Sequence, residues 1–292
     1  MATRRSVLGM TAGMMAGAII APSTALAQRH IALGLQLYTV RDDLNRDFDG
    51  TLKQVAAIGY RKVQCNLTVN GRTAKQLRKI FDGLGLGWDS IHSSGDALRG
   101  AVQQTIDQAR DAGVRNIVCS FPLYPADRDI RITGPSLDDW KRNADAFNRI
   151  GGLCRRAGLS FGYHNHNVEF HRIDGAYAYD TLIRLTDPAL VELEMDIGWV
   201  VAGGADPVAY LTKYPDRYAS LHVKDLTAAG IPNTGMKMTS AVVGTGIVKW
   251  DAVLAAVKKS AVRNAYVELE APYVPSPLDM VRASYAYLKT RL

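Results

Sequence analysis

The feature that most constrains the fold is a regular alternation of short apolar runs with longer amphipathic runs from residue 32 onward. Short apolar runs are typical of buried strands, and longer runs with apolar residues every three or four positions are typical of helices. We expect strands over residues 32–38, 61–66, 88–93, 116–121, 159–164, 191–196, 218–223 and 265–270. We expect helices over residues 48–58, 73–84, 95–112, 136–157, 177–185, 206–213, 249–259 and 276–292.

Eight consecutive strand–helix units predict a (β/α)8 barrel, the TIM barrel, in the α/β class. A doubly wound sheet is the alternative, but no glycine-rich fingerprint follows the first strand. The sequence shows no linker and no shift in composition, so we expect one barrel domain over residues 28–292. Barrel enzymes carry their chemistry at the carboxyl ends of the strands, which is where functional residues are to be sought.

The first 27 residues have the features of an export signal. Arg4 and Arg5 precede an apolar, small-residue run over 11–21, and an Ala-Leu-Ala cleavage signal stands directly before Gln28. The paired arginines and the weakly hydrophobic core indicate the twin-arginine route. The apolar run is shorter than the roughly 20 residues that span a bilayer, which argues against a membrane anchor. We therefore expect a periplasmic or secreted protein.

Composition limits the partners. The 292-residue chain is 47% hydrophobic and 22% charged, as ordinary globular proteins are. Loss of the two signal arginines lowers the net charge from +7 to +5, and no Lys/Arg runs follow, so we expect no nucleic-acid partner. Three cysteines without a C-x-x-C pair indicate buried free thiols. No later segment predicts a membrane span. The sequence leaves open whether the protein forms a homo-oligomer.

Metal-capable residues occur at the ends of four consecutive predicted strands. His164 and His166 lie two residues apart, so both imidazoles face the same space. The next three strands carry Asp196, then His222 with Lys224, and then Glu268 with Glu270. Each residue alone could be a salt-bridged interior group, but four neighbouring strand ends favour a metal site. Mixed imidazole and carboxylate ligands suit Mn²⁺, Zn²⁺, Fe²⁺ or Co²⁺, so we predict a divalent metal site at these strand ends.

Six motifs carry a resemblance over residues 32–290. They are Leu-Gln-Leu-Tyr-Thr-Val-Arg, Tyr-His-Asn-His-x-x-Glu-Phe, Met-Asp-Ile-Gly-Trp, His-Val-Lys-Asp, Gly-x-Gly-x-x-x-Trp and Val-Glu-Leu-Glu. In this order they resemble the sugar phosphate isomerase/epimerase family, also called the xylose isomerase-like barrels. The resemblance implies a metal site built from Glu, Asp, His and Glu on strands five to eight. Asp196, His222 and Glu268 match that pattern, whereas His164 replaces the first glutamate.

The resemblance implies a metal-dependent isomerase or epimerase that acts on a carbohydrate or polyol through an enediolate. Glu268 is the expected base, with His166 and Lys224 as acid or oxyanion partners. One alternative is a lyase or hydrolase that acts on 3-keto-glycosides by β-elimination, which export and the missing glutamate both favour. A second alternative is a non-catalytic periplasmic sugar-binding protein.

Other residues near the strand ends have weaker signals. Gln36, Tyr38 and His92 lie near the ends of the first and third strands and are expected to contact substrate, with a core role as the alternative. Trp199 stands where epimerases of the family place a substrate-binding histidine, and could stack on a sugar or cap the barrel.

Three acidic residues have expected supporting roles. Glu169 lies close to the histidine pair and is expected to support it. Glu192 and Glu194 share the facing of Asp196 but lie deeper in the strand, which favours a structural role.

Overall fold

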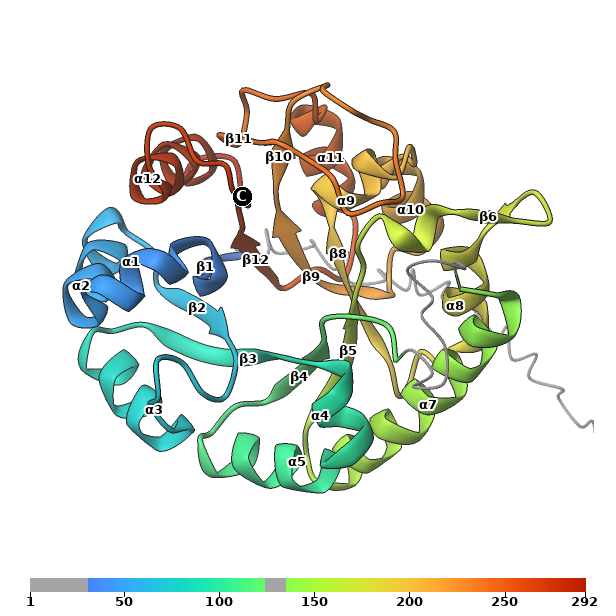
Figure 1. Cartoon of the computed structure of the whole chain (residues 1–292), viewed down its shortest axis with the longest axis horizontal. Coiled ribbons are helices and arrows are strands. Elements are labelled where there is room, and N and C mark those ends of the chain that lie inside the picture. The colour runs from blue at the N-terminus through green and yellow to red at the C-terminus, as the bar shows by residue number, and fades with distance from the viewer. Residues whose placement is uncertain (1–30, 124–134) are drawn as a thin grey trace, which may run out of the picture.

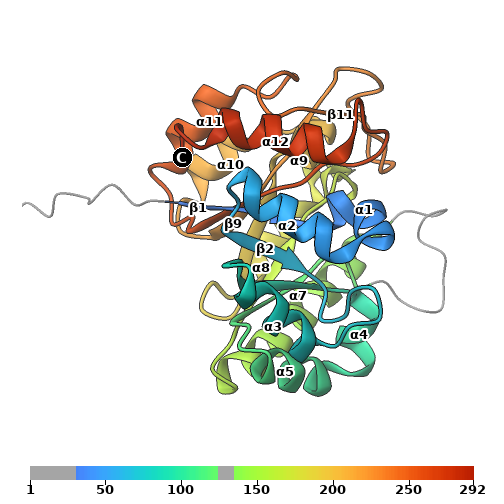
Figure 2. The ribbon, with the colours of Figure 1, turned by 90° about the vertical axis from the view of Figure 1, so that its left-hand side faces the viewer.

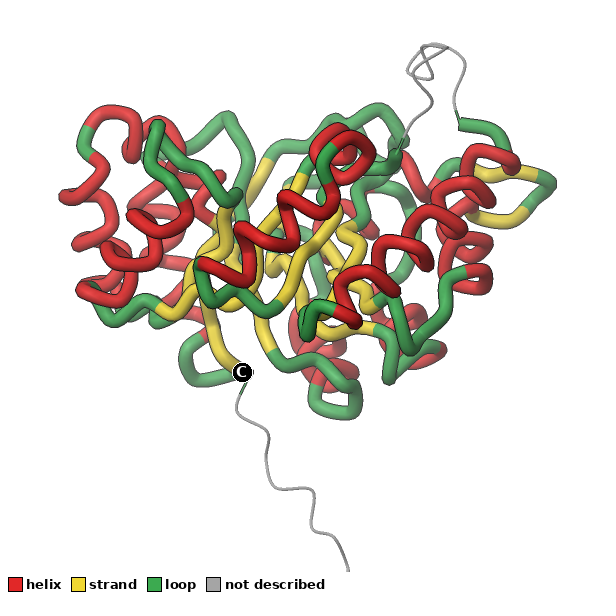
Figure 3. The backbone as a smooth tube through the Cα atoms, turned by 90° about the horizontal axis from the view of Figure 1, so that it is seen from below, coloured by secondary structure: helices red, strands yellow, loops and turns green. Residues whose placement is uncertain are grey.

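Eight parallel strands form a closed barrel surrounded by helices, so the predicted (β/α)8 fold is confirmed (Figures 1 and 3). The computed structural model describes residues 31–123 and 135–292, and the predicted export signal lies outside these residues. The barrel strands are β1 (Ala32–Gln36), β2 (Lys62–Cys65), β3 (Gly87–Ser93), β4 (Asn116–Cys119), β5 (Ser160–His164), β8 (Glu192–Asp196), β9 (Tyr218–Val223) and β12 (Asn264–Val267).

Helices cover the outside of the barrel. The longer helices are α2 (Phe48–Ile58), α3 (Ala74–Gly83), α5 (Val102–Asp111), α7 (Leu137–Arg156), α8 (Ala178–Leu185), α10 (Pro207–Lys213), α11 (Trp250–Val257) and α12 (Pro277–Leu288). Shorter elements decorate the loops: η1 (Leu37–Val40), α1 (Arg41–Arg46), α4 (Gly95–Gly100), η2 (Val168–Phe170), α9 (Ile197–Ala202), and the hairpins β6 (Arg172–Ile173) with β7 (Ala176–Tyr177) and β10 (Asp225–Leu226) with β11 (Ser240–Ala241).

The two ends of the described chain close the barrel. Leu35 on β1 is in register with Val63 on β2 and with Val267 on β12, both in parallel ladders. Outside the strands, the last helix α12 lies beside α2 (Figure 2). There the Tyr60 hydroxyl donates a 2.9 Å hydrogen bond to the Val281 carbonyl. The first and last units therefore complete one continuous sheet.

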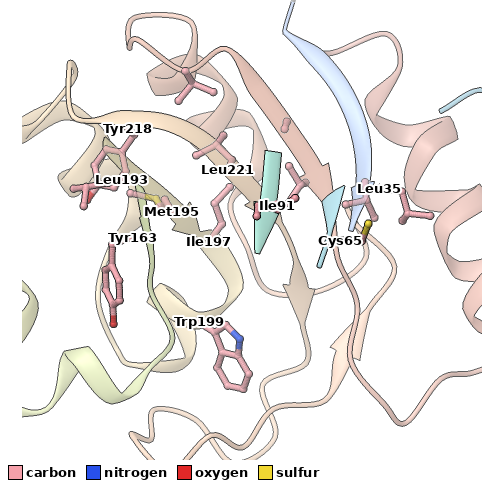
Figure 4. Packing of buried hydrophobic residues seen from close by; sticks show 14 of the residues in the cluster. Leu35, Cys65, Ile91, Tyr163, Leu193, Met195, Ile197, Trp199, Tyr218 and Leu221 are labelled. Atoms are coloured by element: carbon pink, nitrogen blue, oxygen red, sulfur yellow. The ribbon is translucent and has the colours of Figure 1, made fainter. Parts of the chain in front are cut away.

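Strand alternation separates the apolar layer from the polar interior. On β8, Leu193 and Met195 are buried in the apolar core, together with Leu221 of β9 (Figure 4). Their neighbours Glu194 and Asp196 consequently face the inside of the barrel. The same alternation places polar residues of other strands in that interior.

Some predicted boundaries differ from the structure. The helix expected over 95–112 is two helices, α4 and α5, because the backbone of Ala101 leaves the helical region at φ −142°. The last strand ends at Val267, so Glu268 and Glu270 lie in the segment that follows β12.

Two expectations about the chain as a whole can be compared with the structure. All three cysteines are buried and free, as expected. Within residues 31–123 and 135–292, no helix combines the length and apolar character that crossing a bilayer requires.

Candidate functional site

A cavity of about 520 Å³ opens at the carboxyl ends of the barrel strands. Among the sequence-predicted residues, those that line it are Gln36, Tyr38, His92, His164, His166 and Glu268. Arg41 and Glu270 line it as well. The cavity therefore lies where the barrel geometry places active sites.

The four predicted metal ligands lie together next to this cavity. His164, Asp196, His222 and Glu268 each offer a ligand atom, and these atoms lie within 4.8 Å of one another. The parallel register explains part of this proximity, because Asp196 on β8 stands opposite His222 on β9. All four side chains are buried. We call this group the cation site.

The donor set of the cation site fits a divalent cation. His222 Nδ1 lies 2.8 Å from Glu268 Oε2, and Asp196 Oδ2 lies 3.9 Å from both His164 Nε2 and His222 Nδ1. Asp196 Oδ1 accepts a 2.8 Å hydrogen bond from Trp199 N, whereas its buried Oδ2 accepts none from the described residues. This buried oxygen is stabilised by positive charge, which Lys224 Nζ supplies at 3.0 Å and which a divalent cation in the site would also supply.

Lys224 is the resident positive charge beside the cation site. Its fully buried Nζ lies 3.0 Å from Asp196 Oδ2 and 2.9 Å from carboxylate oxygens of both Glu268 and Glu270. Although burial opposes the charge, these carboxylates raise the pKa of Lys224 well above its usual value. Lys224 is therefore a permanent ammonium group within the site.

The carboxylates dominate the electrostatics. Burial lowers the pKa of His222, but Glu194 and Glu268 outweigh it and raise that pKa to about 10. Burial raises the pKa of Asp196 to about 6, against the opposing effect of Lys224. For Glu268, Lys224 and His222 overcome the effect of burial and hold the pKa well below its usual value. The site thus concentrates negative charge that attracts cations.

His166 borders the cavity as a neutral imidazole. Its ring lies 4.9 Å from that of His164, as the two-residue spacing predicts. Burial, followed by the nearby charges of His164 and Lys224, lowers the pKa of His166 well below 6.5. Its Nδ1 has no hydrogen-bond partner in the described part of the chain. A neutral ring with a free nitrogen at the cavity can accept a proton from a ligand.

Glu169 holds the segment that carries His166. Its Oε2 accepts a 2.9 Å hydrogen bond from His166 N, and its Oε1 accepts one from the Tyr163 hydroxyl. This geometry agrees with the expected supporting role.

The residues expected to contact substrate differ in position. Tyr38 is half exposed at the cavity, with the Arg41 guanidinium 4.0 Å from its ring centre. The Gln36 side chain donates a 2.9 Å hydrogen bond to Gln64 Oε1. Trp199 is buried away from the cavity lining, and its ring centre lies 5.1 Å from Lys224 Nζ and 5.7 Å from the His166 ring. Their contacts with substrate stay predictions.

Sequence reasoning missed Gln64 and underrated Glu194. Glu194 lies beneath the cation site and contacts His92, and it completes a second possible ligand group of His92, His164, Glu194 and His222. Strand alternation did place Glu194 on the face of Asp196. That signal gave the direction of the side chain but not its distance from the histidines of other strands.

The family described as the xylose isomerase-like TIM barrel matches residues 52–291. The chain belongs to this family. The resemblance inferred from the motifs is therefore confirmed.

Curated relatives match only part of the chain. The inosose dehydratase of Clostridium beijerinckii is 35% identical over 91 residues, which cover 31% of this chain and 30% of that protein. The inosose dehydratase of Geobacillus kaustophilus is 36% identical over 88 residues, 30% of this chain and 28% of that protein. The match thus spans less than a third of these relatives.

Solved xylose isomerase-like barrels match nearly the whole chain. A sugar phosphate isomerase/epimerase from Parabacteroides distasonis is 26% identical with a TM-score of 0.74, covering 94% of this chain and 98% of that one. A zinc-bound structure of the IolI protein is 14% identical with a TM-score of 0.69, covering 90% and 99%. The second likeness shows the shared fold alone.

Proposed function

We propose that this chain is a metal-dependent enzyme that removes a proton from the carbon next to a ketone of a sugar or cyclic polyol and expels the β-oxygen substituent. One observation carries the choice of elimination. His164 takes the strand-five position where the family resemblance expects a glutamate, and the remaining carboxylate, Glu268, is held by Lys224 and His222. Of the cavity-lining residues that lie outside the cation site, His166 therefore offers a neutral acceptor in place of the missing glutamate.

His164, Asp196, His222 and Glu268 would hold the metal, which when bound supplies a Lewis acid beside the substrate ketone. Asp196 Oδ2, which accepts no hydrogen bond from the described residues, and the other buried carboxylates support this assignment. The zinc in the IolI structure shows that a barrel of this fold accommodates such an ion, without naming the metal used here.

A single acid–base residue is sufficient for elimination. His166 takes the proton from the carbon next to the ketone, the bond from the β-carbon to its oxygen substituent breaks, and the same imidazolium returns the proton to the departing oxygen. The products are an unsaturated ketone and water, or an alcohol from a glycoside. Lys224 stays protonated and keeps Asp196, Glu268 and Glu270 in place. The partial matches to inosose dehydratases support this outcome.

Isomerisation or epimerisation is the second candidate. It requires a group that protonates the opposite face of the intermediate, and Glu268 borders the cavity and could take that part. The similarity to a sugar phosphate isomerase/epimerase favours this candidate.

The first experiment measures metal content in purified wild type, His222→Ala, Asp196→Asn and His171→Ala. We expect near-stoichiometric Mn, Zn, Fe or Co in wild type and in His171→Ala, whose histidine bonds Val168 O outside the site. Both site variants should lose the metal. Wild type that stays metal-free after incubation with each ion would refute the proposal and favour a sugar-binding protein.

The second experiment incubates the metal-loaded protein with keto-polyols and 3-keto-glycosides in D₂O. Elimination produces an unsaturated ketone that absorbs in the ultraviolet, whereas isomerisation returns deuterium to an intact sugar. His166→Gln should retain the metal and lose about 100-fold or more in kcat, because a positioned acid–base group contributes about that much. Glu268→Gln should lose metal and activity together. A His166→Gln variant with wild-type kcat would remove His166 from the mechanism.

A further inference from the structure

A buried network lies directly beneath the cation site. Gln64 on β2 accepts two hydrogen bonds at Oε1, from Gln36 Nε2 at 2.9 Å and from His222 Nε2 at 2.6 Å. Its Nε2 donates to Ser90 Oγ and to Glu194 Oε2, both at 2.9 Å. Every polar atom of this fully buried amide therefore has a partner.

These partners fix the orientation of the Gln64 amide. If the amide were reversed, its oxygen would face the Glu194 carboxylate and its nitrogen would face Gln36 Nε2, and both contacts would be repulsive. The oxygen therefore faces His222 Nε2. Because a carbonyl oxygen only accepts hydrogen bonds, His222 Nε2 must carry a proton. A metal in the cation site would take the lone pair of Nδ1, the other ring nitrogen, which faces Asp196 and Glu268.

Glu194 reinforces this arrangement from β8, where it lies two residues before Asp196. Its Oε1 lies 2.6 Å from His92 Nε2, 3.2 Å from His222 Nε2 and 3.3 Å from His164 Nδ1. Its Oε2 is held by the Ser220 hydroxyl at 2.7 Å in addition to Gln64. An ionised carboxylate only accepts, so it favours N–H groups on the imidazole nitrogens that face it.

We propose that Glu194 and Gln64 are positioning residues. They keep the N–H groups of His164 Nδ1 and His222 Nε2 on the side away from the cation site. His164 Nε2 and His222 Nδ1 then present their lone pairs to that site. The inference rests on the proposed function, because it takes that site to bind a metal. It also selects between the two ligand groups. A metal among His92, His164, Glu194 and His222 would need the nitrogens that carry the protons.

Glu194→Gln tests the proposal with little change in volume. The amide oxygen of the variant remains with its donors Gln64 Nε2 and Ser220, so its NH₂ group faces the imidazoles. A donor in that place requires a lone pair on His164 Nδ1, which moves the proton of His164 to Nε2, whereas Gln64 keeps the proton of His222 on Nε2. The ligand nitrogen of His164 is then blocked. Loss of such a supporting partner weakens metal binding about 10- to 100-fold.

The measurement is Zn²⁺ affinity by competition with a chelator, for wild type, Glu194→Gln, Glu192→Gln and Asp196→Asn. Glu192 is the matched control, since it lies two residues earlier on β8 and pairs with Arg263 at 2.6 Å. We expect Glu194→Gln to bind Zn²⁺ about 10- to 100-fold more weakly and Glu192→Gln to bind it as wild type does. In ¹⁵N-histidine NMR of the Zn²⁺-loaded wild type, His222 should carry its proton at Nε2.

The outcomes separate this inference from the proposed function. Wild-type affinity in Glu194→Gln, with affinity lost in Asp196→Asn, would overturn the positioning role and leave the cation site standing. Full affinity in Asp196→Asn would overturn the cation site itself. Zn²⁺ lost in Glu194→Gln and His92→Phe but retained in Asp196→Asn would make Glu194 a ligand. If Glu194→Gln does not fold, Gln64→Met should weaken Zn²⁺ binding about tenfold, and unchanged affinity would refute the proposal.

Discussion

Lys224, predicted as an acid or oxyanion partner, is paired with three carboxylates in the structure. Its ammonium group joins carboxylates of β8 and of the segment after β12, two of which line the cavity, although Lys224 itself does not. Breaking a buried ion pair by removing one partner is strongly destabilising, because the other charge stays buried. Lys224 therefore stabilises the metal-free site as well as shaping it.

Replacing Lys224 with Met should lower the free energy of unfolding in EDTA by about 3–5 kcal/mol, since three carboxylates lose their cation. Saturating Zn²⁺ should narrow the difference, because it supplies positive charge to the same oxygens. Urea denaturation measures both effects. Lys213→Met is the control, as its exposed ammonium lies 3.8 Å from Asp180 and should contribute little. A Lys224→Met variant as stable as this control would contradict the role.

Glu169 should make stability depend on pH. Burial raises its pKa from 4.5 to about 7 in the folded chain. The folded state therefore keeps the proton longer than the unfolded state, so wild-type stability falls as pH rises from about 4.5 to 7 and changes no further above that. Glu169→Gln has no such titration, and its stability relative to wild type should rise by about 3 kcal/mol across this window. Urea denaturation at several pH values measures this difference, which would stay flat if the prediction is wrong.

The sequence indicated the predicted metal ligands more clearly than Glu194 and Gln64, which contact them. Alternation along β8 and the order of strand ends are local properties, so they placed Asp196 and His222 at a common site. The role of Glu194 depends on contacts with β3, β5 and β9, whose separation across the barrel no local pattern contains. Gln64 carried no signal at all, because its contribution lies in which amide atom faces His222.

Among the elements, the long connection between β9 and α11 has an unusual anchor. The buried Asp225 carboxylate accepts hydrogen bonds from four backbone N–H groups, at Leu226, Gly244, Gly246 and Val248, and from Trp250 Nε1. A Cβ at position 246 would come within 2.2 Å of Asp225 Oδ1, so glycine is required for this approach. The carboxylate thus fixes the end of the connection next to Lys224.

Asp225→Asn should destabilise the chain by about 3 kcal/mol, because an amide cannot accept all five bonds and leaves buried donors unpaired, at about 1–3 kcal/mol each. The connection between residues 227 and 249 should also become more sensitive to limited proteolysis. Asp251→Asn is the matched control, an exposed acid in the first turn of α11 whose loss should stay below about 1 kcal/mol. Equal stability of the two variants would contradict the anchoring role.

Element boundaries were harder to predict than the elements themselves. The division between α4 and α5 falls at Ala101, within a run that contains no proline, so the helical pattern continues through it. Gly100, whose helix propensity is low, ends α4 directly before this break. At the last strand the apolar alternation continues to Leu269, although its ladder to β9 ends at Val267.

For the molecule as a whole, the repeated strand–helix pattern was enough to predict the barrel. The closing pair of β1 and β12 has no sequence signal of its own, but it follows from the strand count and the right-handed crossovers of parallel strands. What the barrel acts on does not follow from the fold, which hosts many chemistries.

The export signal at the start of the chain predicts where the protein is located. We expect cleavage before Gln28 and export that depends on the arginine pair. Changing Arg4 and Arg5 to Lys should leave the precursor in the cytoplasm, while wild type yields a periplasmic chain that begins at Gln28. Cell fractionation and N-terminal sequencing measure both. Export that survives the double substitution would disprove the twin-arginine route.

The network under the cation site has a consequence for biosynthesis. Five different strands supply this network, namely β2 with Gln64, β3 with His92, β5 with His164, β8 with Glu194 and β9 with His222. Glu268 follows β12, the last strand of the barrel. No fragment released early from the ribosome contains this set, so a metal in the proposed cation site would be acquired only after the final strand has closed the ring. A ligand that binds only the closed form adds about 2.7 kcal/mol of stability at a concentration 100 times its Kd. On the proposed function, the compartment in which folding ends would therefore determine which ion is loaded.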